Sequence, residues 1–155
     1  MNKYYSSPQL SILNAVEGDA LPSLNKHPSQ VDVVRFCAAI RNFHRFHYDQ
    51  EFTSRHGLAD IIVPGFLIGS WCIEIVSRSF GPGVEISKLK FRNTSAAPIS
   101  DDYVIEGRIE TRVNQSSVLC ALEVRQVSSG EIVTTATVGV RERSMYEERS
   151  GQLTS

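Results

Sequence analysis

The spacing of apolar residues along this chain predicts two helices followed by a run of strands. Residues 30–40 carry apolar side chains at helical intervals, and Ser29 before them is a suitable N-cap. Pro64 and Gly65 open a longer segment that stays apolar on almost all sides until a Gly-Pro-Gly sequence ends it. A helix with so little polar surface is buried, and its two glycines, one turn apart, would let a sheet approach its backbone closely.

After this helix the apolar period changes to two, which is typical of half-buried strands. Residues 84–91, 103–113, 118–127 and 132–140 are the predicted strands, and Ser128-Ser129-Gly130 is a hairpin turn between the last two. The second of these strands has two distinct faces. One face holds charged residues, Glu106, Arg108, Glu110 and Arg112. The other holds Ile105, Gly107, Ile109 and Val113. Residues 18–22 look like a turn entering a short edge segment. A curved antiparallel sheet wrapped around the central helix, an α+β fold, is the economical arrangement.

Length and charge narrow the class of protein. With 155 residues, 41% of them hydrophobic, the chain suffices for one domain, expected over residues 11–145 between a loose segment (1–10) and a polar tail (146–155). The net charge of −1 and the absence of a basic block argue against nucleic-acid binding. The longest apolar stretch, residues 61–76, is interrupted and too short to cross a membrane.

The three cysteines (Cys37, Cys72 and Cys120) are widely separated and lie in apolar surroundings, which fits free thiols in a reducing compartment. No secretory signal is visible, so a cytoplasmic protein is expected.

Residues 42–49 gather more reactive groups than any other segment: an amide, two imidazoles, a phenol and a carboxylate. The surrounding stretch, residues 42–60, is too polar and irregular for a second core helix, and is expected to be a helix end plus an ordered connection. His47 suits general acid–base catalysis near neutral pH, although a hydrogen-bonded structural histidine is the alternative. The Gly65 N–H at a helix N-terminus suits stabilisation of an oxyanion, unless the glycine only makes a tight turn after Pro64.

These residues resemble the MaoC-like and R-specific enoyl-thioester hydratase/dehydratase family, which has the hot dog fold. The family pattern begins Gly-Asp-x-Leu-Pro, as residues 18–22 do, and continues through a His-x-Asp segment to a Pro-Gly pair opening the central helix. The match is closest to hydroxyacyl-thioester dehydratase-like and mesaconyl-thioester hydratase-like proteins, whose segment reads Asn-x-His-Arg-Ile-His-Tyr-Asp. Residues 42–49 reproduce it with Phe46 for Ile, and Arg92, Pro98 and Asp101 fit a later Arg…Pro…Gly-Asp stretch.

The resemblance implies a lyase that hydrates a trans-2-enoyl thioester or dehydrates a 3-hydroxyacyl thioester of coenzyme A or an acyl carrier protein, without a cofactor. It implies a homodimer, or a hetero-oligomer with another hot dog chain, and leaves open a catalytically silent subunit, a thioesterase, or a tailoring dehydratase or cyclase. The family's usual catalytic Asp is Asn42 here, and an amide cannot exchange a proton as a carboxylate does. Asn42 would hold the substrate oxygen or, equally, end the helix in a left-handed conformation.

The remaining candidate residues carry weaker signals. His44 is either a second proton carrier, a group that orients His47, or an ordinary exposed histidine, and Asp49 would hold the loop or fix a histidine tautomer. A metal triad of these three residues fits poorly, so no metal is expected. The candidate substrate-binding residues are Pro64, Phe66, Arg45 and Arg92, the arginines as partners for phosphates.

Overall fold

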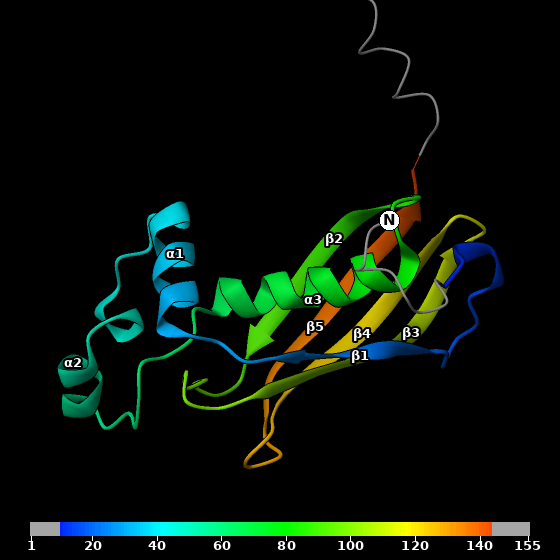
Figure 1. The fold of residues 1–155 in the computed structure, drawn as a ribbon. Helices are drawn as coiled ribbons and strands as arrows, with labels where there is room; N and C mark the ends of the chain where they lie inside the picture. The colour runs from blue at the N-terminus through cyan, green and yellow to red at the C-terminus, as the bar shows by residue number, and fades with distance from the viewer. Residues whose placement is uncertain (1–9, 144–155) are drawn as a thin grey trace, which may run out of the picture.

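The computed structural model describes residues 10–143, which form one sheet with a long helix on one face (Figure 1). The predicted polar tail and all but the last residue of the predicted loose segment lie outside the described residues. Leu10 is described, and its N–H donates to the Ser79 carbonyl at 2.6 Å.

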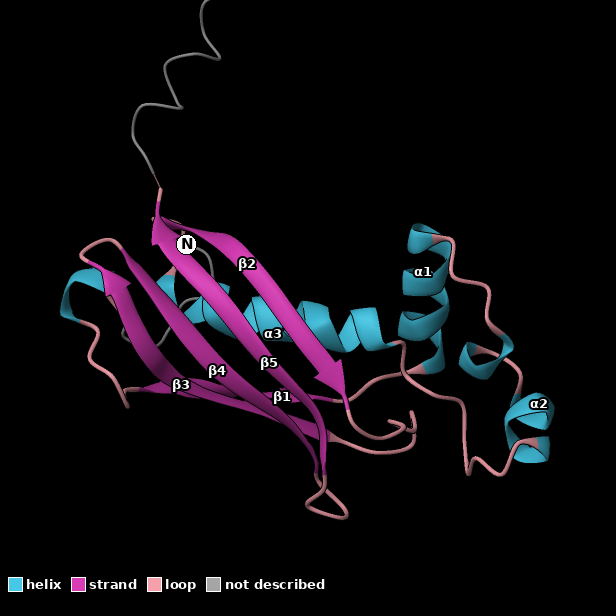
Figure 2. Cartoon of the chain, turned by 180° about the vertical axis from the view of Figure 1, so that it is seen from behind, coloured by secondary structure: helices cyan, strands magenta, loops and turns pink. Residues whose placement is uncertain are grey.

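The five-stranded antiparallel sheet has the order β1-β3-β4-β5-β2. The bounds of its strands are β1 Ala20–Lys26, β2 Val84–Asn93, β3 Tyr103–Asn114, β4 Ser117–Gln126 and β5 Ile132–Glu142. Helix α3 (Gly65–Phe80) lies along the inner face of the sheet, as the two opposite views show (Figures 1 and 2). A short 3-10 helix, η1 (Ile12–Asn14), precedes β1. The predicted α+β architecture and the four predicted strands are confirmed.

The core lies between α3 and the sheet. Eight residues of α3 are buried, and the Trp71 ring lies 5.7 Å from the ring of Tyr103 on β3. The predicted close approach at the glycines is confirmed, because a Cβ at Gly69 would come within 3.0 Å of the Phe91 ring on β2. The side chain of Asn93, two residues further along β2, occupies the space that a Cβ at Gly65 would need. The sheet therefore fixes the N-terminal turn of α3 at close range.

The predicted alternation of β3 fails near its end because the strand contains an extra residue. Ile109 pairs with Cys120 and Thr111 pairs with Leu119, so two residues of β3 oppose one of β4. This bulge exchanges the two faces, and a second register shift between Arg112 and Asn114 leaves Val113 unpaired in this ladder and 57% exposed. The guanidinium of Arg112 instead turns towards the N-terminal segment and donates to backbone carbonyls of Ile12, Leu13 and Ala15.

Beyond the N-terminal end of α3 the chain forms an overhang (residues 30–60) that stands apart from the sheet (Figures 1 and 2). It contains α1 (Gln30–Ile40), the 3-10 helix η2 (Arg45–His47) and α2 (Gln50–Arg55). Within these helices only Val33, Cys37 and Thr53 are buried. The expected boundaries of α1 are confirmed, including its Ser29 N-cap, which forms a capping box with Asp32.

Two details of the overhang differ from the sequence prediction. The short helix α2 was not expected, and it forms because the Asp49 carboxylate caps it by accepting a hydrogen bond from the Phe52 N–H at 2.9 Å. The left-handed residue at the end of α1 is Arg41, with φ 55°, rather than Asn42. No helix within residues 10–143 is long and apolar enough to cross a membrane.

Candidate active site

A backbone carbonyl selects the tautomer of His47. The half-buried imidazole makes a 2.8 Å hydrogen bond from Nδ1 to the Ile62 carbonyl. A carbonyl oxygen only accepts hydrogen bonds, so Nδ1 carries the proton of the neutral ring. Nε2 then has a free lone pair, which is the form that a general base requires.

The segment that carries this carbonyl, residues 61–63, is paired on both sides. On one side the Ile62 N–H donates to the Phe46 carbonyl at 2.8 Å. On the other side Ile62 lies opposite Pro98 in an isolated antiparallel bridge. The two residues after Ile62 lead directly to the first residue of α3, so the partner of His47 and the start of the helix belong to one short stretch of chain.

The Gly65 N–H begins α3 without a capping side chain. Pro64 is the N-cap residue and offers no side-chain hydrogen bond, while its carbonyl accepts from the Leu67 and Ile68 N–H groups. Among residues 10–143 no acceptor is found for the Gly65 N–H. A free N–H at the positive end of a 16-residue helix can donate to an anionic oxygen.

The sequence profile of the hydroxyacyl-thioester dehydratase type 2 family matches residues 6–100, more than half of the chain. The chain belongs to this family. Its activity class is therefore dehydration of hydroxyacyl thioesters, with hydration of enoyl thioesters as the reverse reaction. No curated protein matches the sequence.

Solved structures show the hot dog fold expected of this dehydratase family. The R-hydratase PhaJ1 from Pseudomonas aeruginosa matches with a TM-score of 0.79 at 17% identity, covering 88% of this chain and 87% of that one. The (R)-hydratase from A. caviae matches with a TM-score of 0.77 at 17% identity, covering 84% and 98%. A chain of the ChsH1-ChsH2 complex from Mycobacterium tuberculosis matches with a TM-score of 0.75 at 23% identity, covering 83% and 98%.

The other polar residues of this dehydratase's signature segment are engaged with the backbone. The Asn42 side-chain oxygen accepts from the His44 N–H at 3.3 Å, and the Asn42 N–H donates to the Cys37 carbonyl at 2.9 Å. His44 is exposed, and its Nδ1 accepts from the Phe46 N–H at 3.3 Å. Its ring centroid lies 6.1 Å from that of His47. His47 is oriented instead by the hydrogen bond that its Nδ1 donates to the Ile62 carbonyl.

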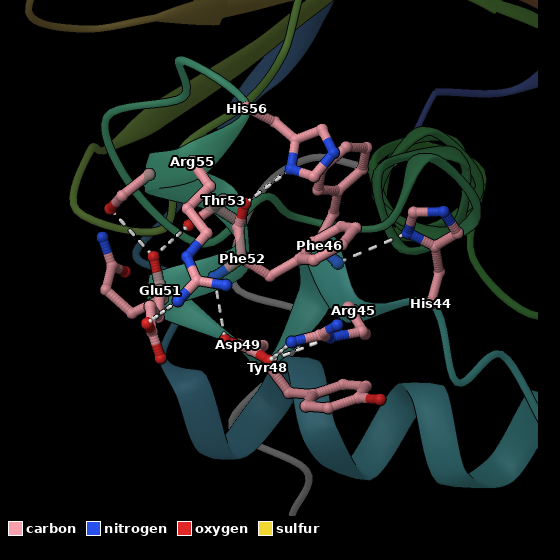
Figure 3. A network of polar contacts seen from close by, with 12 residues as sticks. His44, Arg45, Phe46, Tyr48, Asp49, Glu51, Phe52, Thr53, Arg55 and His56 are labelled. Atoms are coloured by element: carbon pink, nitrogen blue, oxygen red, sulfur yellow. Dashed lines mark hydrogen bonds and ion pairs between the residues drawn. The ribbon is translucent and has the colours of Figure 1, made fainter.

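Arg45 and Asp49 form an ion pair at the N-terminus of α2 (Figure 3). The guanidinium donates to the carboxylate at 2.7 Å and lies 4.3 Å above the Phe52 ring. The Phe52 backbone N–H and this guanidinium hold the pKa of the Asp49 carboxyl below its usual value. Asp49 thus fixes the helix rather than a histidine tautomer, and Arg45 has its charge compensated locally. The described residues hold no group of three side chains suited to a metal ion.

The candidate substrate-binding residues divide between two faces of the molecule. Pro64 is buried, whereas Phe66 at the start of α3 is 67% exposed and its ring lies 5.7 Å from that of Phe91. Arg92 follows Phe91 on β2, so its side chain points to the outer face of the sheet, where it lines a shallow groove with Lys90 and Glu106. This groove lies on the opposite side of the sheet from Gly65.

Sequence reasoning did not identify the Ile62 carbonyl. It is a main-chain group in an apolar stretch, and no side chain marks it. The only available signal was its position immediately before Pro64 and Gly65.

Proposed function

We propose that this chain interconverts 3-hydroxyacyl and trans-2-enoyl thioesters, with His47 as the acid–base group and the Gly65 N–H as the oxyanion donor. The observation that supports it is the hydrogen bond from His47 Nδ1 to the carbonyl of Ile62, three residues before the first residue of α3, which leaves Nε2 available as a base. The thioester carbonyl would accept from the Gly65 N–H, which stabilises negative charge on that oxygen.

In the dehydration direction His47 Nε2 removes the proton from the α-carbon. The C–H electron pair forms an enolate whose oxygen is held by the Gly65 N–H. The enolate then collapses to the α,β double bond while the bond from the β-carbon to oxygen breaks. The departing hydroxide takes the proton back from His47, so water leaves and the imidazole returns to its starting form. Asn42 would hold the departing oxygen once substrate displaces its present contact with the His44 N–H.

The decisive experiment follows the ultraviolet absorbance of a short trans-2-enoyl coenzyme A with the purified protein. We expect loss of the conjugated-enoyl signal with wild type, and a decrease in rate of at least about 100-fold in His47→Gln. His56→Gln is a matched control, because the His56 Nδ1 also lies 2.8 Å from a backbone carbonyl, that of Phe52, in the same overhang. Equal rates in wild type and His47→Gln would refute the role of His47.

A second candidate function is that of a non-catalytic subunit in a hetero-oligomer. Asn42 in place of the family's Asp favours it. The apolar surface of the overhang, where Val31, Val34 and Phe43 are 58%, 45% and 67% exposed, suits burial against a second hot dog chain, identical or different. One of the matched structures is itself a complex of two named components, ChsH1 and ChsH2. A homodimer that turns over substrate alone would reject this candidate; a silent chain that activates a second hot dog protein would support it.

Turnover of the same acyl group on coenzyme A and on an acyl carrier protein would show which of the two is the thioester carrier. Release of free thiol would instead indicate a thioesterase. We also propose that the protein works in a reducing, cytoplasmic compartment. Its three buried cysteine thiols, none of them in a disulfide, support this.

A further inference from the structure

Tyr103, the first residue of β3, is the largest side chain that is fully buried in the described part of the chain. Its ring packs against Trp71 of α3, and burial raises the pKa of its hydroxyl well above the usual range. The hydroxyl donates a 2.6 Å hydrogen bond to the Pro98 carbonyl. A buried tyrosine needs such a partner, so the bond alone would be unremarkable. The acceptor, however, lies in the segment that pairs with the backbone partner of His47.

Pro98 lies between Ala97, which is buried in the core, and Ile99, which packs against the core. The adjoining residues pair with residues 61–63: the Val63 N–H donates to the Ala97 carbonyl at 2.8 Å, and the Ile99 N–H donates to the Ile61 carbonyl at 2.9 Å. This bridge lies outside the five strands, so no longer ladder supports it. The Asp101 N–H is a second donor to the Pro98 carbonyl, at 3.4 Å. The short bond from Tyr103 therefore adds a side-chain tie between the core and the Pro98 carbonyl itself.

The opposite side of residues 61–63 faces His47. The Ile62 carbonyl accepts from His47 Nδ1 at 2.8 Å, and the Ile62 N–H donates to the Phe46 carbonyl at 2.8 Å. A continuous path of contacts thus runs from the buried phenol, through two paired backbone segments, to the imidazole.

We propose that Tyr103 is a positioning residue for His47: its hydroxyl holds the Pro98 segment in register, and so fixes the Ile62 carbonyl that selects the Nδ1–H tautomer of His47. The proposal rests on the proposed function of His47 in catalysis, but its structural part is measurable without substrate. Tyr103 is a positioning residue because its hydroxyl donates to the Pro98 carbonyl and its ring packs against Trp71. It acts on the base through a carbonyl placed at hydrogen-bond distance.

The first test reads the tautomer of His47 directly, by long-range ¹⁵N–¹H correlation spectra of the imidazole. Tyr103→Phe keeps the ring against Trp71 and removes only the hydroxyl. We expect wild type to show a protonated Nδ1, and Tyr103→Phe to show a mixture of both neutral tautomers. Tyr48→Phe is the matched control, because the Tyr48 hydroxyl also donates to a backbone carbonyl, that of Phe43 at 3.2 Å, which lies outside residues 61–63 and 97–99. Tyr48→Phe should match wild type.

Amide hydrogen exchange supplies the second readout. We expect the Val63 and Ile99 N–H groups to exchange at least about 10-fold faster in Tyr103→Phe, because their bridge loses the hydrogen bond that holds the Pro98 carbonyl. Amides in the centre of the β3–β4 ladder should keep their wild-type rates. If the whole sheet exchanges faster by the same factor, Tyr103 is only a core residue and the proposal is wrong.

The kinetic readout connects the tautomer to turnover. In Tyr103→Phe we expect kcat to fall about 10-fold while KM stays within about twofold, because the base is misplaced but the acyl site is not. Should Tyr103→Phe fail to fold, Ile99→Pro tests the same path by removing the N–H that donates to the Ile61 carbonyl. An unchanged His47 tautomer in a folded variant of either kind overturns the proposal. If His47→Gln retains full activity while Tyr103→Phe changes the tautomer, the catalytic role of His47 fails and the structural link stands.

Discussion

Gly65→Ala adds one methyl group where the N-terminal turn of α3 meets β2. The new Cβ would overlap the side-chain amide of Asn93, whose oxygen accepts a 2.8 Å hydrogen bond from the Thr134 hydroxyl. Thr134 is fully buried, so a displaced Asn93 leaves its hydroxyl without that acceptor. The backbone N–H of residue 65 is retained, which separates the packing role of the glycine from its proposed role as an oxyanion donor.

The expected magnitude comes from the affected groups. Losing the hydrogen bond costs about 0.5–1.5 kcal/mol, and leaving a buried hydroxyl unsatisfied costs about 1–3 kcal/mol. Asn93 is exposed enough to move aside in part, and alanine favours the helix over glycine by up to about 1 kcal/mol. We therefore expect Gly65→Ala to lower the free energy of unfolding by about 1–2 kcal/mol, or Tm by about 2–8 °C for a domain of this size.

Urea denaturation of a double-mutant cycle measures the effect. Asn93→Ala removes the overlapping amide and, by taking the acceptor from Thr134, should itself cost about 1–2 kcal/mol. In the double variant the methyl group has room, so we expect its stability to equal that of Asn93→Ala within about 0.5 kcal/mol. Additive losses in the double variant would refute the steric argument. A Gly65→Ala protein as stable as wild type would refute it as well.

Three further predictions concern the rest of the fold. Arg41→Gly should be more stable than Arg41→Val by about 1–2 kcal/mol in urea denaturation, because φ is 55° at this position and a β-branched residue is strained there; equal stabilities would contradict this. Arg112→Met should lower the free energy of unfolding by about 2 kcal/mol through loss of the guanidinium's hydrogen bonds to five backbone carbonyls, three of them in the N-terminal segment. Arg112→Lys, which keeps only the charge, should recover less than half of that. Burial raises the pKa of Cys72 and of Cys120 to about 12 and also raises that of Cys37, so at pH 8 thiol-specific reagents should label these residues only as fast as the protein unfolds; rapid labelling of the native protein would contradict the burial.

The main architecture was predictable because it follows from residue periodicity. The all-round apolar character of residues 65–80 identified the central helix, and the alternation in β4 and β5 identified their strands and the turn between them. Both signals are repeated over many residues, so single exceptions do not hide them.

The features that escaped prediction each depend on one residue or on the backbone. The bulge after Ile109 inserts a single residue, and nothing in the local composition distinguishes it from regular alternation. The left-handed position at the end of α1 falls on Arg41, although Asn42 next to it has the better intrinsic preference for that conformation. The orienting partner of His47 is the carbonyl of Ile62, and a main-chain group leaves no signature in the order of side chains.

The division between the overhang and the sheet implies that the two parts of the candidate site differ in local stability. Gly65 begins a helix that buries eight residues in the core, whereas His47 lies in an element with no buried residue, attached through two hydrogen bonds to the Ile62 backbone. Segments with few buried contacts open at a lower free energy than the global unfolding reaction. If His47 is the base, as proposed, we expect it to leave and rejoin the site while the core stays folded, so that the fraction of molecules in which it is seated scales the observed rate of turnover.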